Sequence, residues 1–127
     1  MTSKDYVKIF KESGALLEGH FVLTSGRHGP SYFQCAKVLQ NSKYLKLFSD
    51  QIADHFNNSQ IDTIVSPAVG GIVIGTAVGI SMNKPAIFAE REKGRMTFRR
   101  GFSIEKGESI LILSLIHISE PTRRRLI

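Results

Sequence analysis

The spacing of hydrophobic and polar positions predicts two helices in the first half of the chain. Tyr6, Ile9 and Phe10 recur at helical spacing until Gly14, which predicts a helix of about ten residues. A second helix is predicted to begin at Ser42, because apolar residues then step by three, four and four: Leu45, Phe48, Ile52 and Phe56. Between these helices, residues 20–24 and 32–36 have extended patterns around the polar turn 25–30, which predicts two short strands. Cys35 would share a strand face with Phe33, as a small buried apolar residue.

The second half alternates short apolar runs with turns. Residues 63–65 predict a buried strand, 66–71 a tight loop, and the uncharged stretch ending at Met82 a helix. Further strands are predicted at 85–89 and 109–113. Strands that alternate with helices favour an α/β fold with a mainly parallel sheet and right-handed crossovers.

Composition fits one soluble domain. The chain has 127 residues, of which 42% are hydrophobic, and its single cysteine forms no internal disulfide or zinc motif. The N-terminal residues are charged throughout and predict no signal peptide, so we expect a cytoplasmic protein.

The excess positive charge is concentrated. The formal net charge is +6, and residues 90–106 contain six basic and three acidic side chains. Such a cluster suits a polyanion, either nucleic acid or a phosphorylated small molecule. A solvated charged hairpin explains the same residues on charge alone.

Three segments carry candidate chemistry. The loop 66–71, between a strand and a helix, could offer backbone N–H groups to a phosphate, with Gly70 and Gly71 allowing close approach. Gly75 and Gly79 are expected to let the helix pack on the sheet.

The second segment, residues 89–102, could be a loop that closes over an anion. Its candidate phosphate clamps are Arg91, Arg95, Arg99 and Arg100. The third segment, residues 23–33, follows a polar turn with Tyr32 and Phe33, which could stack on a flat ring or belong to the core.

Together the stretches HFVLTSGRHGPSYFQCA, IVSPAVGGIVIG and IFAEREKGRMTFRRGF resemble the orotate phosphoribosyltransferase family, from about residue 4 to residue 113. The resemblance implies a type I phosphoribosyltransferase fold, with an N-terminal hood over residues 1–40. It also implies transfer of phosphoribose from phosphoribosyl pyrophosphate (PRPP) to orotate, in a homodimer, with Mg²⁺ accompanying PRPP and no metal ligands assigned to the chain.

Three groups of site residues follow from the resemblance. It places PRPP and pyrophosphate at Ser66, Ala68, Val69, Gly70, Gly71 and Arg99. It places orotate at Ser25, Gly26, Arg27, Tyr32 and Phe33. It assigns catalysis to a flexible loop, 90–101, whose nearest candidates are Arg91, Lys93 and Arg95.

The chain departs from the family pattern after residue 113. The family continues with two acidic residues and a Thr-Thr-Gly-Gly-Ser-like loop, neither of which occurs in residues 114–127. We therefore expect a truncated domain with a non-native tail, unstable and without orotidine monophosphate synthesis; the alternative is a genuine variant with a divergent tail.

Other function classes fit less well. The uncharged stretch 63–83 contains Pro67 and paired glycines, which make a poor membrane span. A nucleic-acid-binding module would use the basic segment and the Arg-rich tail, but the sequence has no recognition motif for it. A phosphoribosyltransferase for another base is the nearest alternative enzyme.

Overall fold

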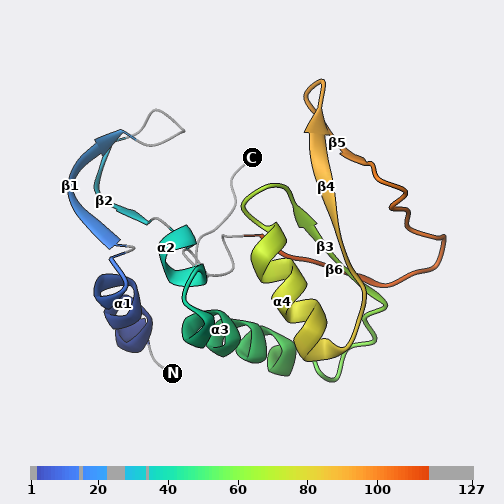
Figure 1. Cartoon of the computed structure of the whole chain (residues 1–127), viewed down its shortest axis with the longest axis horizontal. Helices are drawn as coiled ribbons and strands as arrows, with labels where there is room; N and C mark the ends of the chain where they lie inside the picture. The colour runs from blue at the N-terminus through green and yellow to red at the C-terminus, as the bar shows by residue number, and fades with distance from the viewer. Residues whose placement is uncertain (1–2, 15, 23–27, 34, 115–127) are drawn as a thin grey trace. The chain divides into compact units, whose positions relative to one another are not determined.

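The computed structural model describes residues 3–14, 16–22, 28–33 and 35–114 (Figure 1). The chain divides into two compact units, Met1–Tyr44 and Leu45–Ile127. The predicted tail, residues 114–127, lies outside the described residues except for Ser114.

The first unit contains helix α1 (Ser3–Glu12), strands β1 (Leu16–Val22) and β2 (His28–Phe33), and the short helix α2 (Cys35–Leu39). The predicted first helix is confirmed, and Gly14 follows it with a φ of +77°. β1 and β2 pair antiparallel, with Leu16 opposite Phe33. The predicted strand 32–36 is wrong beyond β2, because Cys35 begins α2; Cys35 is buried, as expected.

The second unit is built on a four-stranded sheet in the order β5-β4-β3-β6 (Figure 1). Its strands are β3 (Thr63–Pro67), β4 (Ala86–Glu92), β5 (Arg95–Phe98) and β6 (Ile110–Ile112). β4 and β6 both run parallel to β3, while β5 is antiparallel to β4. The mainly parallel sheet is therefore confirmed, with an unpredicted antiparallel strand, β5, at one edge.

Helix α4 (Ile72–Met82) packs on β3 and β4 through its glycines. A Cβ added at Gly75 would lie 2.5 Å from Ser66 Oγ, and one at Gly79 would lie 2.9 Å from Ala86 Cβ. Both distances are shorter than any ordinary contact, so the absence of side chains allows the close approach of helix and sheet. The packing role predicted for Gly75 and Gly79 is confirmed.

Buried apolar side chains from the sheet and α4 form the core of the second unit. They include Ile64, Ile74, Val78, Leu111 and Leu113. Removing these side chains from water is the main favourable term for folding. None of the helices in the described part of the chain has the length and hydropathy of a membrane span.

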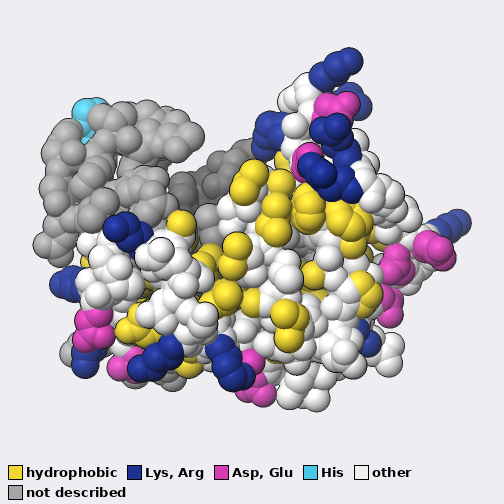
Figure 2. All heavy atoms as spheres, viewed as in Figure 1, with side chains coloured by type: hydrophobic (Ala, Val, Ile, Leu, Met, Phe, Trp, Pro, Cys, Tyr) yellow, Lys and Arg dark blue, Asp and Glu magenta, His cyan; other side chains and the backbone are white. Residues whose placement is uncertain are grey.

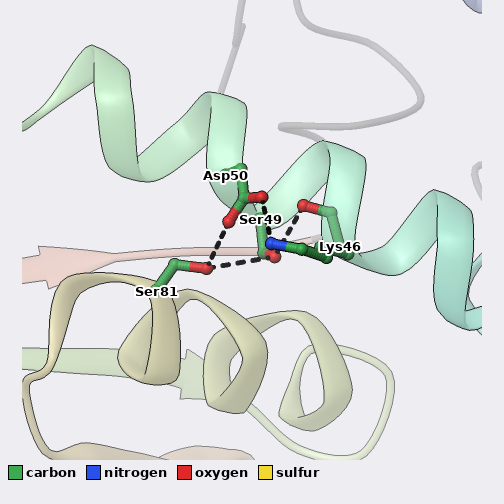
Figure 3. Close-up of polar contacts among 4 residues, drawn as sticks. All are labelled: Lys46, Ser49, Asp50 and Ser81. Atoms are coloured by element: carbon green, nitrogen blue, oxygen red, sulfur yellow. Dashed lines mark hydrogen bonds and ion pairs between the residues drawn. The ribbon is translucent and has the colours of Figure 1, made fainter.

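Helix α3 (Ser42–His55) confirms the second predicted helix and contacts α4 through polar side chains (Figure 3). The Ser81 hydroxyl of α4 donates to Asp50 Oδ1 at 2.9 Å, and its oxygen lies 3.3 Å from Ser49 Oγ. Lys46 Nζ donates to the other oxygen of Asp50 at 2.7 Å. These bonds hold the pKa of Asp50 below its ordinary value, first through Lys46 and then through Ser81.

Candidate functional site

The loop between β3 and α4 lies at the carboxyl end of β3. Its first N–H, from Ala68, donates to Ala89 O of the neighbouring strand at 2.8 Å. The N–H groups of Gly71 and Ile72 donate within the loop, to Pro67 O at 3.0 Å and Val69 O at 3.1 Å. The peptide bond between Ala68 and Val69 is cis.

Two backbone donors of this loop remain uncommitted. Among the described residues, the N–H groups of Val69 and Gly70 form no hydrogen bond to the backbone or to a side chain. Both residues are exposed, Val69 to 81% of its surface. These donors precede the first turn of α4, whose dipole is positive at that end. The loop therefore offers N–H groups to an anion from solvent.

Ser66 and Gly71 have structural roles beside this loop. The Ser66 side chain is 3% exposed and lies against Gly75 of α4. A Cβ at Gly71 would lie 2.7 Å from Pro67 O, so the turn itself requires glycine there. Close approach of a ligand at Gly70 and Gly71 stays a prediction.

The predicted loop 90–101 is mostly a β-hairpin. β4 continues three residues beyond the predicted strand, to Glu92, and turns through Lys93 and Gly94, with φ of 51° and 78°. Two successive residues at positive φ are typical of tight hairpin turns that match the twist of the strands. β5 was missed because its four residues, RMTF, alternate polar and apolar over too short a run, within a segment interpreted as a charged loop.

The exposed cations of the hairpin are Arg91, Lys93 and Arg95. Arg91 Nη1 makes a long hydrogen bond of 3.4 Å to Gly94 O. Within the described ranges, none of the three forms an ion pair with a carboxylate. Figure 2 shows basic and acidic side chains gathered over the hairpin. These three side chains are therefore exposed cations without a carboxylate partner in the described part of the chain.

Arg99 and Arg100 are instead engaged by carboxylates of β4. Arg100 Nε donates to Glu90 Oε1 at 2.5 Å, and Arg99 Nη1 lies 3.5 Å from Glu90 Oε2. Arg99 Nε also lies 3.5 Å from Glu92 Oε2. The hydrogen bond from Arg100 lowers the pKa of Glu90 and raises that of Arg100. The sequence alternative of a hairpin with Glu/Arg pairs is confirmed for this part of the segment.

A backbone hydrogen bond links the β3–α4 loop to the strand that enters the basic hairpin. The bond from Ala68 to Ala89 joins the β3–α4 loop to β4 just before the hairpin begins. In parallel strands, loops at the carboxyl ends are where open α/β sheets bind ligands. A hollow of about 640 Å³ lies elsewhere, near Thr63, Pro85 and Ile87, and contains no predicted site residue.

The predicted orotate residues are described only in part. Ser25, Gly26 and Arg27 lie outside the described residues. Tyr32 and Phe33 belong to β2, where they stand opposite Leu17 and Leu16 in the backbone register, and their side chains are outside the description.

Comparison with curated proteins confirms the resemblance found in the sequence. The chain is 56% identical over 113 residues to an orotate phosphoribosyltransferase from Chlorobaculum parvum, covering 89% of this chain and 58% of that relative. It is 44% identical over 113 residues to the enzyme of the same name from Caldicellulosiruptor bescii, covering 60% of that relative. The chain thus spans less than two thirds of the relatives it matches. No protein-family model matches it.

Solved structures show the same fold. The UMP synthase of Leishmania donovani matches 90% of this chain and 25% of its own, with a TM-score of 0.74 at 22% identity. An orotate phosphoribosyltransferase from Aeropyrum pernix matches 73% of this chain with a TM-score of 0.59 at 21% identity, over 56% of its own length. An adenine phosphoribosyltransferase from Trypanosoma brucei, in complex with AMP, pyrophosphate and ribose-5-phosphate, matches 88% of this chain and 56% of its own. Its TM-score is 0.61 at 17% identity. The predicted α/β fold of the type I phosphoribosyltransferases is therefore confirmed.

Proposed function

We propose that this chain is part of an orotate phosphoribosyltransferase, which forms orotidine monophosphate and pyrophosphate from orotate and PRPP. The identity of 56% over 113 residues to a protein of that name supports the proposal. One structural observation carries it: the uncommitted N–H groups of Val69 and Gly70 directly follow Ala68, whose own N–H bonds the strand that leads to three exposed cations.

The chemistry of the reaction explains why this arrangement is useful. When the bond between the ribosyl carbon and pyrophosphate breaks, negative charge develops on the departing oxygens. Donors that are already oriented toward those oxygens lower the barrier more than flexible donors or water. We assign the backbone donors of the β3–α4 loop to pyrophosphate and the cations Arg91, Lys93 and Arg95 to the charge that develops.

The orotate site, the dimer and the location in the cytoplasm extend this proposal. Orotate would bind at the first unit, through residues 25–27 and the β2 aromatics Tyr32 and Phe33. A second copy would complete the site. Each of these three parts stays a prediction.

Magnesium would enter with PRPP as part of the substrate. The described residues contain no group of three or more His, Cys, Asp or Glu side chains that could hold a metal ion. They therefore do not fit a magnesium site built by the protein alone. Magnesium bound with nucleotides and related substrates takes many of its ligands from phosphate oxygens and water.

Binding of pyrophosphate and PRPP tests the proposal directly. We expect both to protect the hairpin from trypsin at Arg91, Lys93 and Arg95. Replacing all three residues by alanine in one variant should weaken pyrophosphate binding by about tenfold or more, because charge-assisted contacts are lost. The control is Lys106→Ala, which removes an exposed cation outside the hairpin, from the turn that precedes β6.

Other outcomes favour other functions. Random oligonucleotides that bind with a steep salt dependence, without protection by PRPP, would favour a nucleic-acid-binding module. Protection by PRPP that adenine enhances and orotate does not would favour a phosphoribosyltransferase for another base. Equal loss of pyrophosphate binding in the Lys106→Ala control would contradict the assignment to the hairpin.

A further inference from the structure

Glu90 is the most enclosed carboxylate of the hairpin. Its side chain is 17% exposed, compared with 49% for Glu92 on the same strand. Because side chains alternate along a strand, Phe88, Glu90 and Glu92 project from one face of β4. Among the described residues, Glu90 has two cationic partners, Arg100 and Arg99, whereas Glu92 has only Arg99, at 3.5 Å.

Arg100 lies in a turn that needs support from the rest of the protein. Arg100 has a φ of +60° and Gly101 a φ of +78°, and Phe102 N–H donates to Arg99 O at 3.0 Å. A left-handed backbone is unfavourable for a residue with a side chain such as Arg100. Such a conformation persists where surrounding contacts hold it.

Phe88 and Glu90 provide those contacts from β4. The Arg100 guanidinium lies 5.9 Å from the centre of the Phe88 ring, while its Nε donates to Glu90. The Phe102 ring meets Phe88 edge to face, with centroids 5.0 Å apart. The turn 99–102 is therefore fixed to one face of β4 at both Arg100 and Phe102.

We propose that Glu90 is a positioning residue, which uses Arg100 to fix the turn 99–102 against β4 and thereby holds the hairpin in its ligand-binding geometry. The inference rests on the proposed function, since the ligand is the diphosphate of that reaction. It divides the basic residues of the segment into two groups. Arg99 and Arg100 stabilise the hairpin, and Arg91, Lys93 and Arg95 meet the anion.

A comparison of Glu90→Ala with Glu92→Ala separates positioning from simple electrostatics. Each variant removes one negative charge from the same face of the same strand. If only charge mattered, both should bind inorganic pyrophosphate more tightly than the wild-type chain. We expect Glu92→Ala to do so and Glu90→Ala to bind at least about threefold more weakly, on the scale of partly exposed ion pairs.

Hydrogen exchange provides a readout that needs no ligand. The Phe102 amide, which is bonded within the turn, should exchange roughly threefold to fivefold faster in Glu90→Ala and not in Glu92→Ala. Arg100→Gln should have the same effect as Glu90→Ala, and the double variant should add little to either, because both remove one interaction. Circular dichroism checks that each variant is folded. If Glu90→Ala does not fold, Glu90→Gln, which keeps a hydrogen-bond acceptor, replaces it in both measurements.

The results decide the two proposals separately. Pyrophosphate binding by Glu90→Ala as tight as by Glu92→Ala, or unchanged exchange at Phe102, overturns the positioning role. If the wild-type chain binds no pyrophosphate, the proposed function fails, and hydrogen exchange alone then supports or overturns the hold of Glu90 on the turn.

Discussion

Replacing Gly75 by alanine should force α4 away from β3. The new Cβ would lie 2.5 Å from Ser66 Oγ and 2.9 Å from Ser66 Cβ, whereas ordinary contacts begin at 3.4 Å. Ser66 is 3% exposed at the end of β3 and has little room to move. The helix must therefore shift by roughly an ångström in a closely packed interior.

Two opposing terms set the magnitude of this effect. Overpacking a well-packed core costs about 1–3 kcal/mol. Alanine in a helix interior is favoured over glycine by about 0.8–1 kcal/mol. The free energy of unfolding should therefore fall, by up to about 2 kcal/mol. With a urea dependence of about 1.5 kcal/mol/M, the midpoint of urea denaturation falls by up to roughly 1.3 M.

Urea denaturation followed by far-UV circular dichroism measures this loss. Thr76→Ala, at an exposed neighbouring position of α4, is the control for helix propensity and should raise the midpoint slightly. In a Ser66→Gly background the obstructing atoms are absent, so Gly75→Ala should become stabilising. A midpoint for Gly75→Ala at or above that of the wild type, or the same loss in both backgrounds, would refute the packing described for α4.

Three further predictions concern charge, the hairpin turn and exposed apolar residues. Asp50 has a lowered pKa in the folded state, so its stabilisation is present above its unfolded pKa of about 3.8 and is lost as the pH falls further. Asp50→Asn should therefore lower the urea midpoint at pH 7 and flatten its decline between about pH 5 and 2; an unchanged acid limb would contradict this. Gly94→Ala should destabilise the chain by about 1 kcal/mol in urea, because the φ of +78° is unfavourable for alanine even though no atom lies within 4 Å of its Cβ; a neutral result would mean that the turn adopts another conformation. The isolated chain should self-associate with rising concentration in light scattering, since Ile80 and Ile112 are 77% and 61% exposed. It should show no orotidine monophosphate synthesis, because residues 114–127 contain neither the acidic pair nor the Gly-rich loop of the family. Ile112→Lys should reduce the association, and robust turnover with magnesium and PRPP would contradict the expected inactivity.

Local patterns in the sequence were sufficient for the main helices and the parallel strands. The apolar residues between Leu45 and Phe56 are spaced by three and four, which predicted one apolar face of α3. The apolar run at 63–65 predicted a buried strand. The motif at 66–71 located the loop between β3 and α4, because glycine and proline mark tight turns in any context. Resemblance over three motifs then identified the relatives.

Short or charged elements could not be recognised in this way. α2 has five residues, too few to establish a helical period, and its first residues continue an extended pattern from β2. β5 has only two apolar residues, Met96 and Phe98, and forms because Lys93 and Gly94 turn the chain back onto β4. The structure of β5 therefore depends on its pairing with β4, which a local sequence pattern does not record.

The roles of the basic residues depended on tertiary structure for the same reason. The sequence by itself determined that cations are concentrated between residues 90 and 106, because the order of the residues fixes where the charges lie along the chain. Only the folded chain decided which of these cations are paired. The hairpin brings Arg99 and Arg100 back to Glu90, nine and ten residues away along the chain. Arg91, Lys93 and Arg95 stay exposed. Ion pairing falls off steeply with distance and orientation, and those are set by the register of β4 with β5.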